Sequence, residues 1–229
     1  MDNKINLARG RALDLSEPII MGIVNVTPDS FSDGGQFFNI TAALKHAMQL
    51  LDDGATILDI GGESTRPGAP DVTLEDELQR VISIIKAIRE QSDCVISIDT
   101  SKAEVMRQAI EAGADIVNDV RALQEPGALE VVAQYPDVVV CLMHMQGQPR
   151  SMQNDPHYDD LASEINEFFN QRIAACETAG IKQSQLILDP GFGFGKTLKH
   201  NYQILAQFND FAQFGLPLLA GLSRKSMIG

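Results

Sequence analysis

Three short apolar segments of the sequence end in acidic or amide side chains. Asp99 closes "VISID", Asn118 lies in "IVND" and Asp189 closes "LILD". Carboxylate and amide oxygens accept hydrogen bonds, so two carboxylates and an amide gathered at one mouth would suit a flat ligand with adjacent N–H donors, such as an aminopyrimidinone edge. Each aspartate taken alone could instead cap the loop or helix that follows it.

Two basic side chains and one amide lie in polar segments after other apolar runs. Arg66 occurs in "GGESTRPG" and Lys225 in "GLSRKSMIG". The loop after the seventh strand of a barrel often binds phosphate or carboxylate, although residues 223–226 could also form a solvated polar turn. Asn25 and nearby aspartates could hold Mg²⁺, which usually takes one or two protein oxygens plus phosphate. Alternatively, Asn25 hydrogen-bonds its own loop.

A unit of amphipathic helix, glycine, apolar strand and polar loop repeats along the chain. Gly54 and Gly113 stand where a left-handed residue would end a helix. The nearly continuous apolar runs are typical of parallel strands covered on both faces. We expect strands at 19–24, 56–60, 94–99, 115–118, 137–143, 186–189 and 216–221. We expect helices at 40–53, 73–91, 102–112, 127–134, 158–179 and 198–214.

Such alternation predicts an α/β fold, either an open doubly wound sheet or a (β/α)8 barrel. An open sheet concentrates its ligand groups at one switch point, whereas a barrel collects them from all strand ends at one mouth. Nearly every expected strand ends in a functional side chain, which favours the TIM barrel. A hairpin over residues 5–15, turning at Arg9 and Gly10, precedes the first barrel strand. No linker divides residues 1–229, so we expect a single domain.

The composition is that of a globular protein with an acidic surface. The 229 residues include 18 Lys and Arg against 31 Asp and Glu, a net charge of −13, which disfavours nucleic acid and anionic membranes as partners. An anionic ligand would need a local cation or metal. The three scattered cysteines and the lack of a long apolar segment predict a cytoplasmic protein without a disulfide framework or zinc site. The segment "GFGFGKT" lacks the spacing of a nucleotide-binding P-loop.

Taken together, these stretches resemble the dihydropteroate synthase family of pterin-binding enzymes. The matching segments follow the family's order through the whole chain: "GIVNVTPDSFSDGG", "DIGGESTRPGA", "SIDTSK", "IVNDV", "DPGFGFGK" and "GLSRKSMIG". The resemblance implies a (β/α)8 barrel that joins 7,8-dihydropterin-6-ylmethyl diphosphate to 4-aminobenzoate and releases pyrophosphate, with Mg²⁺ as cofactor. It also implies a homodimer.

The same resemblance implies roles for individual residues. Asn25 would bind Mg²⁺, and Thr65 would contact the diphosphate. The pterin would be held by Asp99, Asn118, Asp189 and Lys225, and the aminobenzoate pocket would be lined by Phe31, Pro67, Phe194 and Ser226. Asp33 would belong to a mobile first loop and would take part in catalysis. Asp99 and Asp189 could stabilise a pterin methyl cation, while Lys225 and Arg66 could stabilise the leaving group.

One departure from the family concerns the end of the chain. The family continues past "SRKSMIG" into an eighth strand with an Arg-x-His motif that helps bind pyrophosphate, whereas this sequence ends at Gly229. We expect the last βα unit to be omitted from the sequence rather than lost from the protein. Two other hypotheses stay open: a pterin-binding methyltransferase domain that passes a methyl group to a corrinoid, and a catalytically inactive paralogue.

Overall fold

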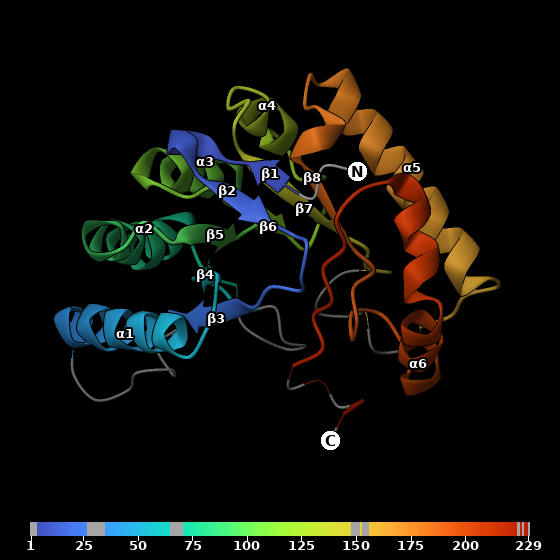
Figure 1. The fold of residues 1–229 in the computed structure, drawn as a ribbon, viewed down its shortest axis with the longest axis horizontal. Coiled ribbons are helices and arrows are strands. Elements are labelled where there is room, and N and C mark those ends of the chain that lie inside the picture. Colours follow the sequence, from blue (N-terminus) through green and yellow to red (C-terminus); the bar gives the residue numbers. More distant parts are fainter. Residues whose placement is uncertain are drawn as a thin grey trace.

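The computed structural model describes residues 4–26, 35–64, 71–147, 152, 156–223, 225 and 227–228. Six parallel strands form one curved sheet in chain order, and each strand hydrogen-bonds to the next (Figure 1). The strands are β3 (Met21–Asn25), β4 (Ile57–Gly61), β5 (Val95–Asp99), β6 (Ile116–Asp119), β7 (Val139–Met143) and β8 (Leu186–Asp189). Consecutive parallel neighbours with helices between them are the arrangement of a TIM barrel, which confirms the predicted fold class.

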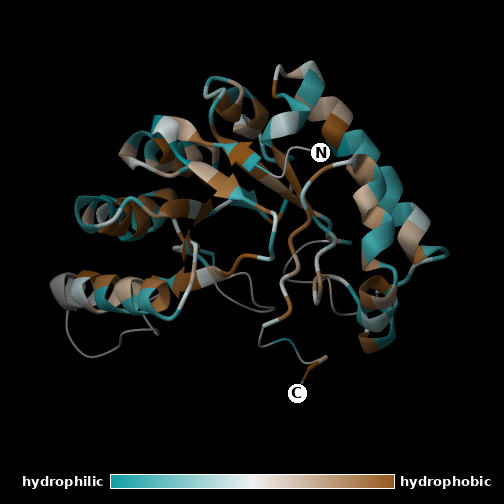
Figure 2. Cartoon of the chain, viewed as in Figure 1, coloured by the Kyte–Doolittle hydropathy of each residue, from teal (hydrophilic) through white to brown (hydrophobic). Residues whose placement is uncertain are grey.

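The helices lie outside the curved sheet, between successive strands (Figure 1). They are α1 (Gly35–Asp52), α2 (Leu74–Gln91), α3 (Ala103–Ala112), α4 (Ala128–Val132), α5 (Leu161–Thr178) and α6 (Leu198–Ala206). Figure 2 shows mostly hydrophobic barrel strands and helices in which hydrophobic and hydrophilic residues alternate. The start of α2 is capped by Thr73, whose hydroxyl accepts a hydrogen bond from the Asp76 amide at 3.1 Å. No helix in the described ranges is long and apolar enough to cross a membrane.

Two apolar cores hold the barrel together. The larger core lies between the sheet and its helices and includes Leu58 and Ile98. The smaller core lies inside the curved sheet, where the strands begin, and includes Ile57 and Val95. Because side chains alternate along a strand, Ile57 and Leu58 enter opposite cores. Burial on both faces explains why these strands appear as continuous apolar runs in the sequence.

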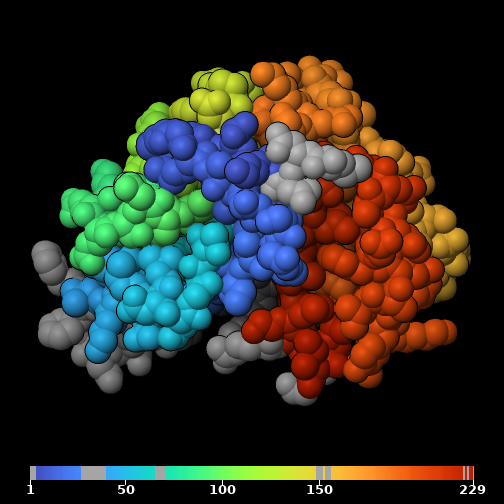
Figure 3. Space-filling model, viewed as in Figure 1, coloured from blue at the N-terminus to red at the C-terminus, as the bar shows by residue number. Residues whose placement is uncertain are grey.

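An N-terminal hairpin closes the end of the barrel at which the strands begin. Its strands β1 (Lys4–Asn6) and β2 (Ala12–Asp14) pair antiparallel, as the sequence predicts. Ile5 and Leu13 pack into the inner core. Arg9 in the turn has a φ of 60°. Figure 3 shows the hairpin, in dark blue, on the surface in the upper part of this face of the molecule.

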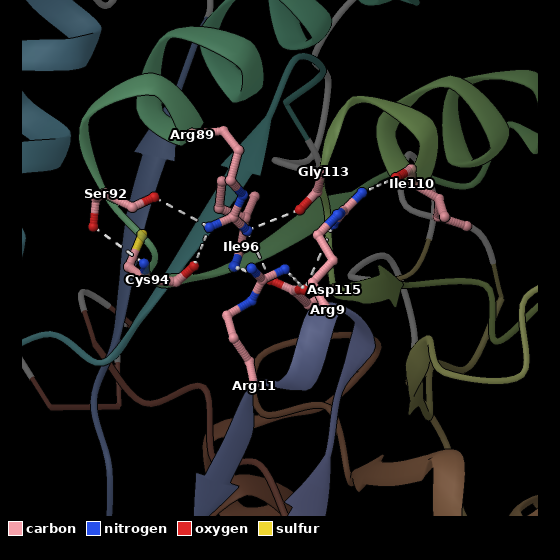
Figure 4. Close-up of polar contacts among 9 residues, drawn as sticks. All are labelled: Arg9, Arg11, Arg89, Ser92, Cys94, Ile96, Ile110, Gly113 and Asp115. Atoms are coloured by element: carbon pink, nitrogen blue, oxygen red, sulfur yellow. Dashed lines mark hydrogen bonds and ion pairs between the residues drawn. The ribbon is translucent and has the colours of Figure 1, made fainter.

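A buried carboxylate ties the hairpin to the barrel (Figure 4). Asp115, just before β6, is fully buried and pairs with Arg11 of the hairpin and, at 2.8 Å, with Arg89 of α2. Arg9 lies 3.9 Å from the same carboxylate and donates to the Ile110 carbonyl at 3.2 Å. Arginines near the C-terminal ends of α2 and α3 also interact favourably with the helix dipoles. The cluster therefore fastens the hairpin to two helix ends.

The prediction of a strand over residues 216–221 is wrong in its extent. Residues 216–221 make one isolated β-bridge, between Leu218 and Leu188, instead of a continuous strand. Pro217 has no N–H to donate to a neighbour, although its carbonyl accepts from the Leu188 amide at 2.9 Å. The segment therefore runs beside β8 without forming a full ladder.

The second half of the expected helix 198–214 is also wrong. The α-helix α6 ends at Ala206, and Phe208–Phe214 form a 3-10 helix. Phenylalanine recurs every third residue in this segment, and a helix with three residues per turn places such residues along one edge. That edge faces the core, where the ring of Phe211 lies 6.0 Å from the ring of Phe169. The expected strand 186–189 matches β8 at both ends, and the other expected elements are present with shifted ends.

Candidate active site

Four neighbouring strands bring residues at or next to their C-terminal ends together at the mouth of the barrel opposite the hairpin. The residues in register across β3 to β6 are Asn25, Gly61, Asp99 and Asn118. Partners in register place their side chains on the same face of the sheet. A Cβ atom at Gly61 would lie 3.5 Å from both Asn25 Oδ1 and Asp99 Oδ2. The glycine therefore leaves a space lined by an amide oxygen and a carboxylate oxygen.

Asp99 is a partly exposed carboxylate at this mouth. It accepts no side-chain hydrogen bond from the residues that the structure describes. Burial is the main cause that raises the pKa of Asp99 well above its ordinary value. Further contributions come from the carboxylates of Asp59, Asp119, Glu77 and Glu63. A cation or an N–H donor beside Asp99 would therefore be strongly favoured.

Asp189 brings a second carboxylate to the mouth from the end of β8. The residue is 6% exposed, and its Oδ1 accepts a hydrogen bond from the Gly191 amide at 2.7 Å. Its other oxygen, Oδ2, accepts from none of the described residues. Burial raises the pKa of Asp189 to about 6, although the Gly191 amide, Lys196 and Lys225 act in the opposite direction. The site thus holds a second buried acceptor that is only half satisfied.

The segment after β8 folds tightly through its glycines. Gly191, Gly193 and Gly195 have φ values of 73°, 76° and 60°, which glycine adopts without strain. A Cβ atom at Gly191 would lie 1.9 Å from the His144 carbonyl oxygen, and one at Gly195 would lie 2.6 Å from the Gln146 carbonyl oxygen. This glycine-rich loop, residues 191–195, therefore packs directly on the backbone that follows β7.

Lys225 contacts Phe194 of the glycine-rich loop. Lys225 Nζ lies 4.1 Å from the centroid of the Phe194 ring, within the range of a cation–π interaction. Burial lowers the pKa of Lys225, while the carboxylates of Asp189 and Asp99 raise it. The ammonium therefore lies in the field of both carboxylates, beside an aromatic face.

Two buried side chains that the sequence analysis did not assign support the same loop. Lys196 is 3% exposed, and its Nζ lies 3.0 Å from both His144 Nδ1 and the Phe194 carbonyl oxygen. Burial lowers the pKa of Lys196 to about 7, and burial together with the Lys196 charge lowers that of His144 to about 2. Lys196 of "GFGFGK" therefore forms buried contacts within the protein. In the sequence, only its position directly after the glycines indicated that it supports this loop.

An ion-pair network holds Glu63, two residues after the end of β4. Lys102 pairs with Glu63 and, at 2.5 Å, with the fully buried Glu77. The Thr100 hydroxyl donates to the other oxygen of Glu77 at 2.5 Å. Glu63 precedes residues 65–70, which lie outside the described ranges. Through Lys102, the network therefore connects Glu63 to Glu77 of α2.

The described part of the site contains six of the residues predicted from the sequence. The structure places these residues at or beside one mouth of the barrel: Asn25, Asp99, Asn118, Asp189, Phe194 and Lys225. The remaining predicted residues lie outside the described ranges: Phe31, Asp33, Thr65, Arg66, Pro67 and Ser226. The roles of this second group stay predictions.

Comparison with known proteins agrees with this geometry. A family model described as pterin binding enzyme matches residues 21–229. The dihydropteroate synthase of Escherichia coli strain K12 is 57% identical over 222 residues, which span 97% of this chain and 78% of that protein. The Yersinia pestis dihydropteroate synthase, solved with a sulfonamide drug complex, has a TM-score of 0.92 at 57% identity and covers 97% of this chain and 80% of its own. The Xanthomonas albilineans enzyme with 4-aminobenzoic acid has a TM-score of 0.92 at 51% identity, covering 100% of this chain and 81% of its own. The chain therefore belongs to the dihydropteroate synthase family of pterin-binding enzymes.

Proposed function

We propose that the protein condenses 7,8-dihydropterin-6-ylmethyl diphosphate with 4-aminobenzoate to give 7,8-dihydropteroate and pyrophosphate in folate biosynthesis. The observation that carries the proposal is the pair of carboxylates, Asp99 and Asp189, each of which has at least one oxygen that accepts from no described residue. A pterin ring has N–H donors along one edge and complements such acceptors. A Xanthomonas albilineans member of the family has been solved with 7,8-dihydropteroate, the product of this reaction.

The reaction replaces a C–O bond by a C–N bond. The bond between the pterin methylene carbon and the diphosphate oxygen breaks, and its electron pair leaves with the diphosphate. The carboxylates of Asp99 and Asp189 would stabilise the methylene cation that remains. The aminobenzoate nitrogen then attacks this carbon and loses a proton. No covalent bond to the protein is required.

Lys225 would serve both substrates. Its ammonium can donate to the pterin and offset the negative charge of the aminobenzoate carboxylate, and the ring of Phe194 beside it would line the aminobenzoate pocket. In a chain of net charge −13, such local cations are needed to hold anionic substrates. We assign the remaining contacts by family resemblance to Phe31, Asp33, Thr65, Arg66, Pro67 and Ser226.

Mg²⁺ is the proposed cofactor, with Asn25 as its protein ligand. Asn25 Oδ1 and Asp99 Oδ2 line the space beside Gly61, and oxygen donors of this kind suit Mg²⁺. No group of three or more His, Cys, Asp and Glu in the described ranges could hold a metal ion, so the diphosphate and water would supply most of the ligands. When bound, the ion would neutralise charge on the diphosphate. A cation here would also favour the ionised form of Asp99.

A product analysis tests the proposed function. The purified protein is mixed with both substrates and Mg²⁺, and the products are identified by mass spectrometry. We expect dihydropteroate and pyrophosphate in equal amounts, with far less pyrophosphate when aminobenzoate is omitted. A methyltransferase domain would release no pyrophosphate from the pterin diphosphate. An inactive paralogue would bind the pterin and form neither product.

We further propose that the protein is a single-domain, cytoplasmic homodimer. Support comes from the family resemblance, the continuous repeat of βα units and the scattered cysteines. Size-exclusion chromatography with light scattering tests the dimer directly. A mass equal to one polypeptide at micromolar concentration would refute it.

A further inference from the structure

Asp59 is a buried carboxylate that the reaction described above does not use. It lies in β4, two residues before Gly61, and is 3% exposed. Its Oδ2 accepts a hydrogen bond from Asn118 Nδ2 at 3.1 Å. The contact crosses the interior of the barrel, since β4 and β6 lie on either side of β5. Asp59 thus reaches a proposed pterin-binding side chain from below the mouth.

This hydrogen bond decides which way the Asn118 amide points. An ionised carboxylate only accepts hydrogen bonds, so the NH₂ end of the amide must face Asp59. The Oδ1 end then has no hydrogen-bond partner among the described residues. The hydrogen bond from Asn118 favours the ionised form of Asp59, while burial acts in the opposite direction and raises its pKa above the ordinary value. The carbonyl end of Asn118 is therefore left for a ligand.

The two pterin edges need different partners. A carboxylate such as Asp189 offers two acceptors, which match the ring N3–H and the 2-amino group. An amide offers one acceptor and one donor, which match the 2-amino group and ring N1, as asparagine pairs with an amino group and a neighbouring ring nitrogen elsewhere. With one Nδ2 hydrogen on Asp59, the second hydrogen and Oδ1 of Asn118 remain for that pair. If the Asn118 amide were turned over, its NH₂ group would face the 2-amino group of the ring and its Oδ1 would face ring N1, so neither hydrogen bond could form.

We propose that Asp59 is a positioning residue that fixes the orientation of the Asn118 amide, so that the site selects ligands with a 2-amino group. The inference rests on the proposed function, because it takes the ligand to be a pterin. Asp59 itself need not touch the ligand. Its contribution is to prevent the amide from turning over, which would otherwise expose NH₂ to the amino group of the ring.

The test compares two ligands that differ only in the 2-amino group, pterin and pteridin-4-one. Their dissociation constants are measured by calorimetry on the wild type, Asp59→Leu and Asp59→Asn. We expect Asp59→Leu to bind pterin about tenfold more weakly, the scale of one lost hydrogen bond, with a smaller loss for pteridin-4-one, which keeps ring N1 but has no amino group to oppose the turned amide. Asp59→Asn can still present an acceptor to Asn118, so we expect an intermediate loss of selectivity of about threefold.

Two controls separate positioning from general damage to the barrel. Ser97→Ala alters the residue paired with Asp59 in register and leaves the bond to Asn118 in place, so its selectivity should match the wild type. In an Asn118→Ala background, Asp59→Asn should no longer change selectivity, because the group that it orients is gone. If Asp59 had a purely structural role, the effect of Asp59→Asn on selectivity would not depend on the presence of the Asn118 side chain.

Each outcome decides between the possibilities. Equal weakening of both ligands by Asp59→Leu would overturn the proposal and leave a structural role. Unchanged selectivity in Asp59→Asn would overturn it even if Asp59→Leu fails to fold. A wild type that binds neither ligand would refute the proposed function, and the inference with it. If the wild type and both Asp59 variants prefer pterin over pteridin-4-one to the same extent, the inference is refuted and the proposed function stands.

Discussion

At the scale of single residues, burial shifts acids and bases of the mouth toward their neutral forms. Burial raises the pKa of Asp189 to about 6 and lowers that of Lys196 to about 7. These groups therefore change charge near neutral pH, unlike ordinary aspartate and lysine. Perturbed groups gathered in this way are typical of functional sites.

Pterin affinity should fall as the pH drops below about 6. Asp189 is ionised above its raised pKa of about 6 and accepts N–H donors in that form; below this pH it takes up a proton and loses acceptor strength. Well below pH 6 the dissociation constant should rise up to about tenfold per pH unit. Calorimetry from pH 5 to 8 measures the change. In Asp189→Asn the affinity should be lower and should change less with pH over this range, and a matching slope in that variant would assign the titration to another group.

Lys225→Ala should slow the reaction strongly. The substitution removes a preorganised ammonium that lies in the field of Asp189 and Asp99, and about 2–4 kcal/mol of transition-state stabilisation should be lost. Steady-state kcat/KM for both substrates provides the measurement. Lys199→Ala, on the exposed side of α6, is the matched control and should remain near wild type. Similar losses in both variants would point to a general charge effect.

At the scale of elements, the glycine-rich loop should tolerate no side chain at its first glycine. Gly191→Ala would place a Cβ 1.9 Å from the His144 carbonyl oxygen, so the loop and Phe194 must move. Gly180→Ala is the control, because Gly180 also has a positive φ of 92° but has open space around its missing Cβ. We expect Gly180→Ala to lose about 1–2 kcal/mol of stability from backbone strain alone and to keep its activity. Gly191→Ala should lose activity as well, measured as a raised KM for aminobenzoate; equal KM values would show that this loop does not shape the pocket.

A second element, the hairpin, should depend on Asp115. Replacing Asp115 by Asn leaves Arg11 and Arg89 close together in a buried setting without their counter-charge (Figure 4). Removing one partner of a buried ion pair typically costs about 3–5 kcal/mol of unfolding free energy. Urea unfolding measures it. Glu104→Gln, which affects an exposed ion pair with Arg107, should change the unfolding free energy little, and a similar effect of both substitutions would contradict the role of the cluster.

The elements themselves were predictable where hydrophobic pattern and glycine position agreed. Each strand from β3 to β8 was predicted from a buried apolar run. The prediction of an α-helix over residues 208–214 was wrong because the three-residue spacing of phenylalanine in this segment is compatible with an amphipathic α-helix as well as with a 3-10 helix. The prediction of a strand over residues 216–221 was wrong because an apolar run does not show how many backbone hydrogen bonds the segment will form with a neighbouring strand.

At the scale of the whole molecule, the two ends of the barrel have different tasks. The hairpin, the inner core and the cluster around Asp115 close the end where the strands begin. The acceptors and cations lie at the opposite end, where the strands finish. The end positions of Asp99 and Asp189 were evident from the sequence. The contacts of Asp59 with Asn118 and of Lys196 with His144 were not, because they depend on strand register and on the path of a loop.

The most direct test of this division is one calorimetric titration of 7,8-dihydropterin-6-ylmethyl diphosphate into Asp189→Asn and Asp115→Asn. At the mouth, Asp189→Asn replaces a buried acceptor by an NH₂ group, and we expect the dissociation constant to rise at least about tenfold. At the hairpin end, Asp115→Asn should leave the dissociation constant unchanged at a temperature where the variant is folded. Wild-type affinity in Asp189→Asn, or a weakened affinity confined to Asp115→Asn, would contradict the placement of the pterin at the mouth.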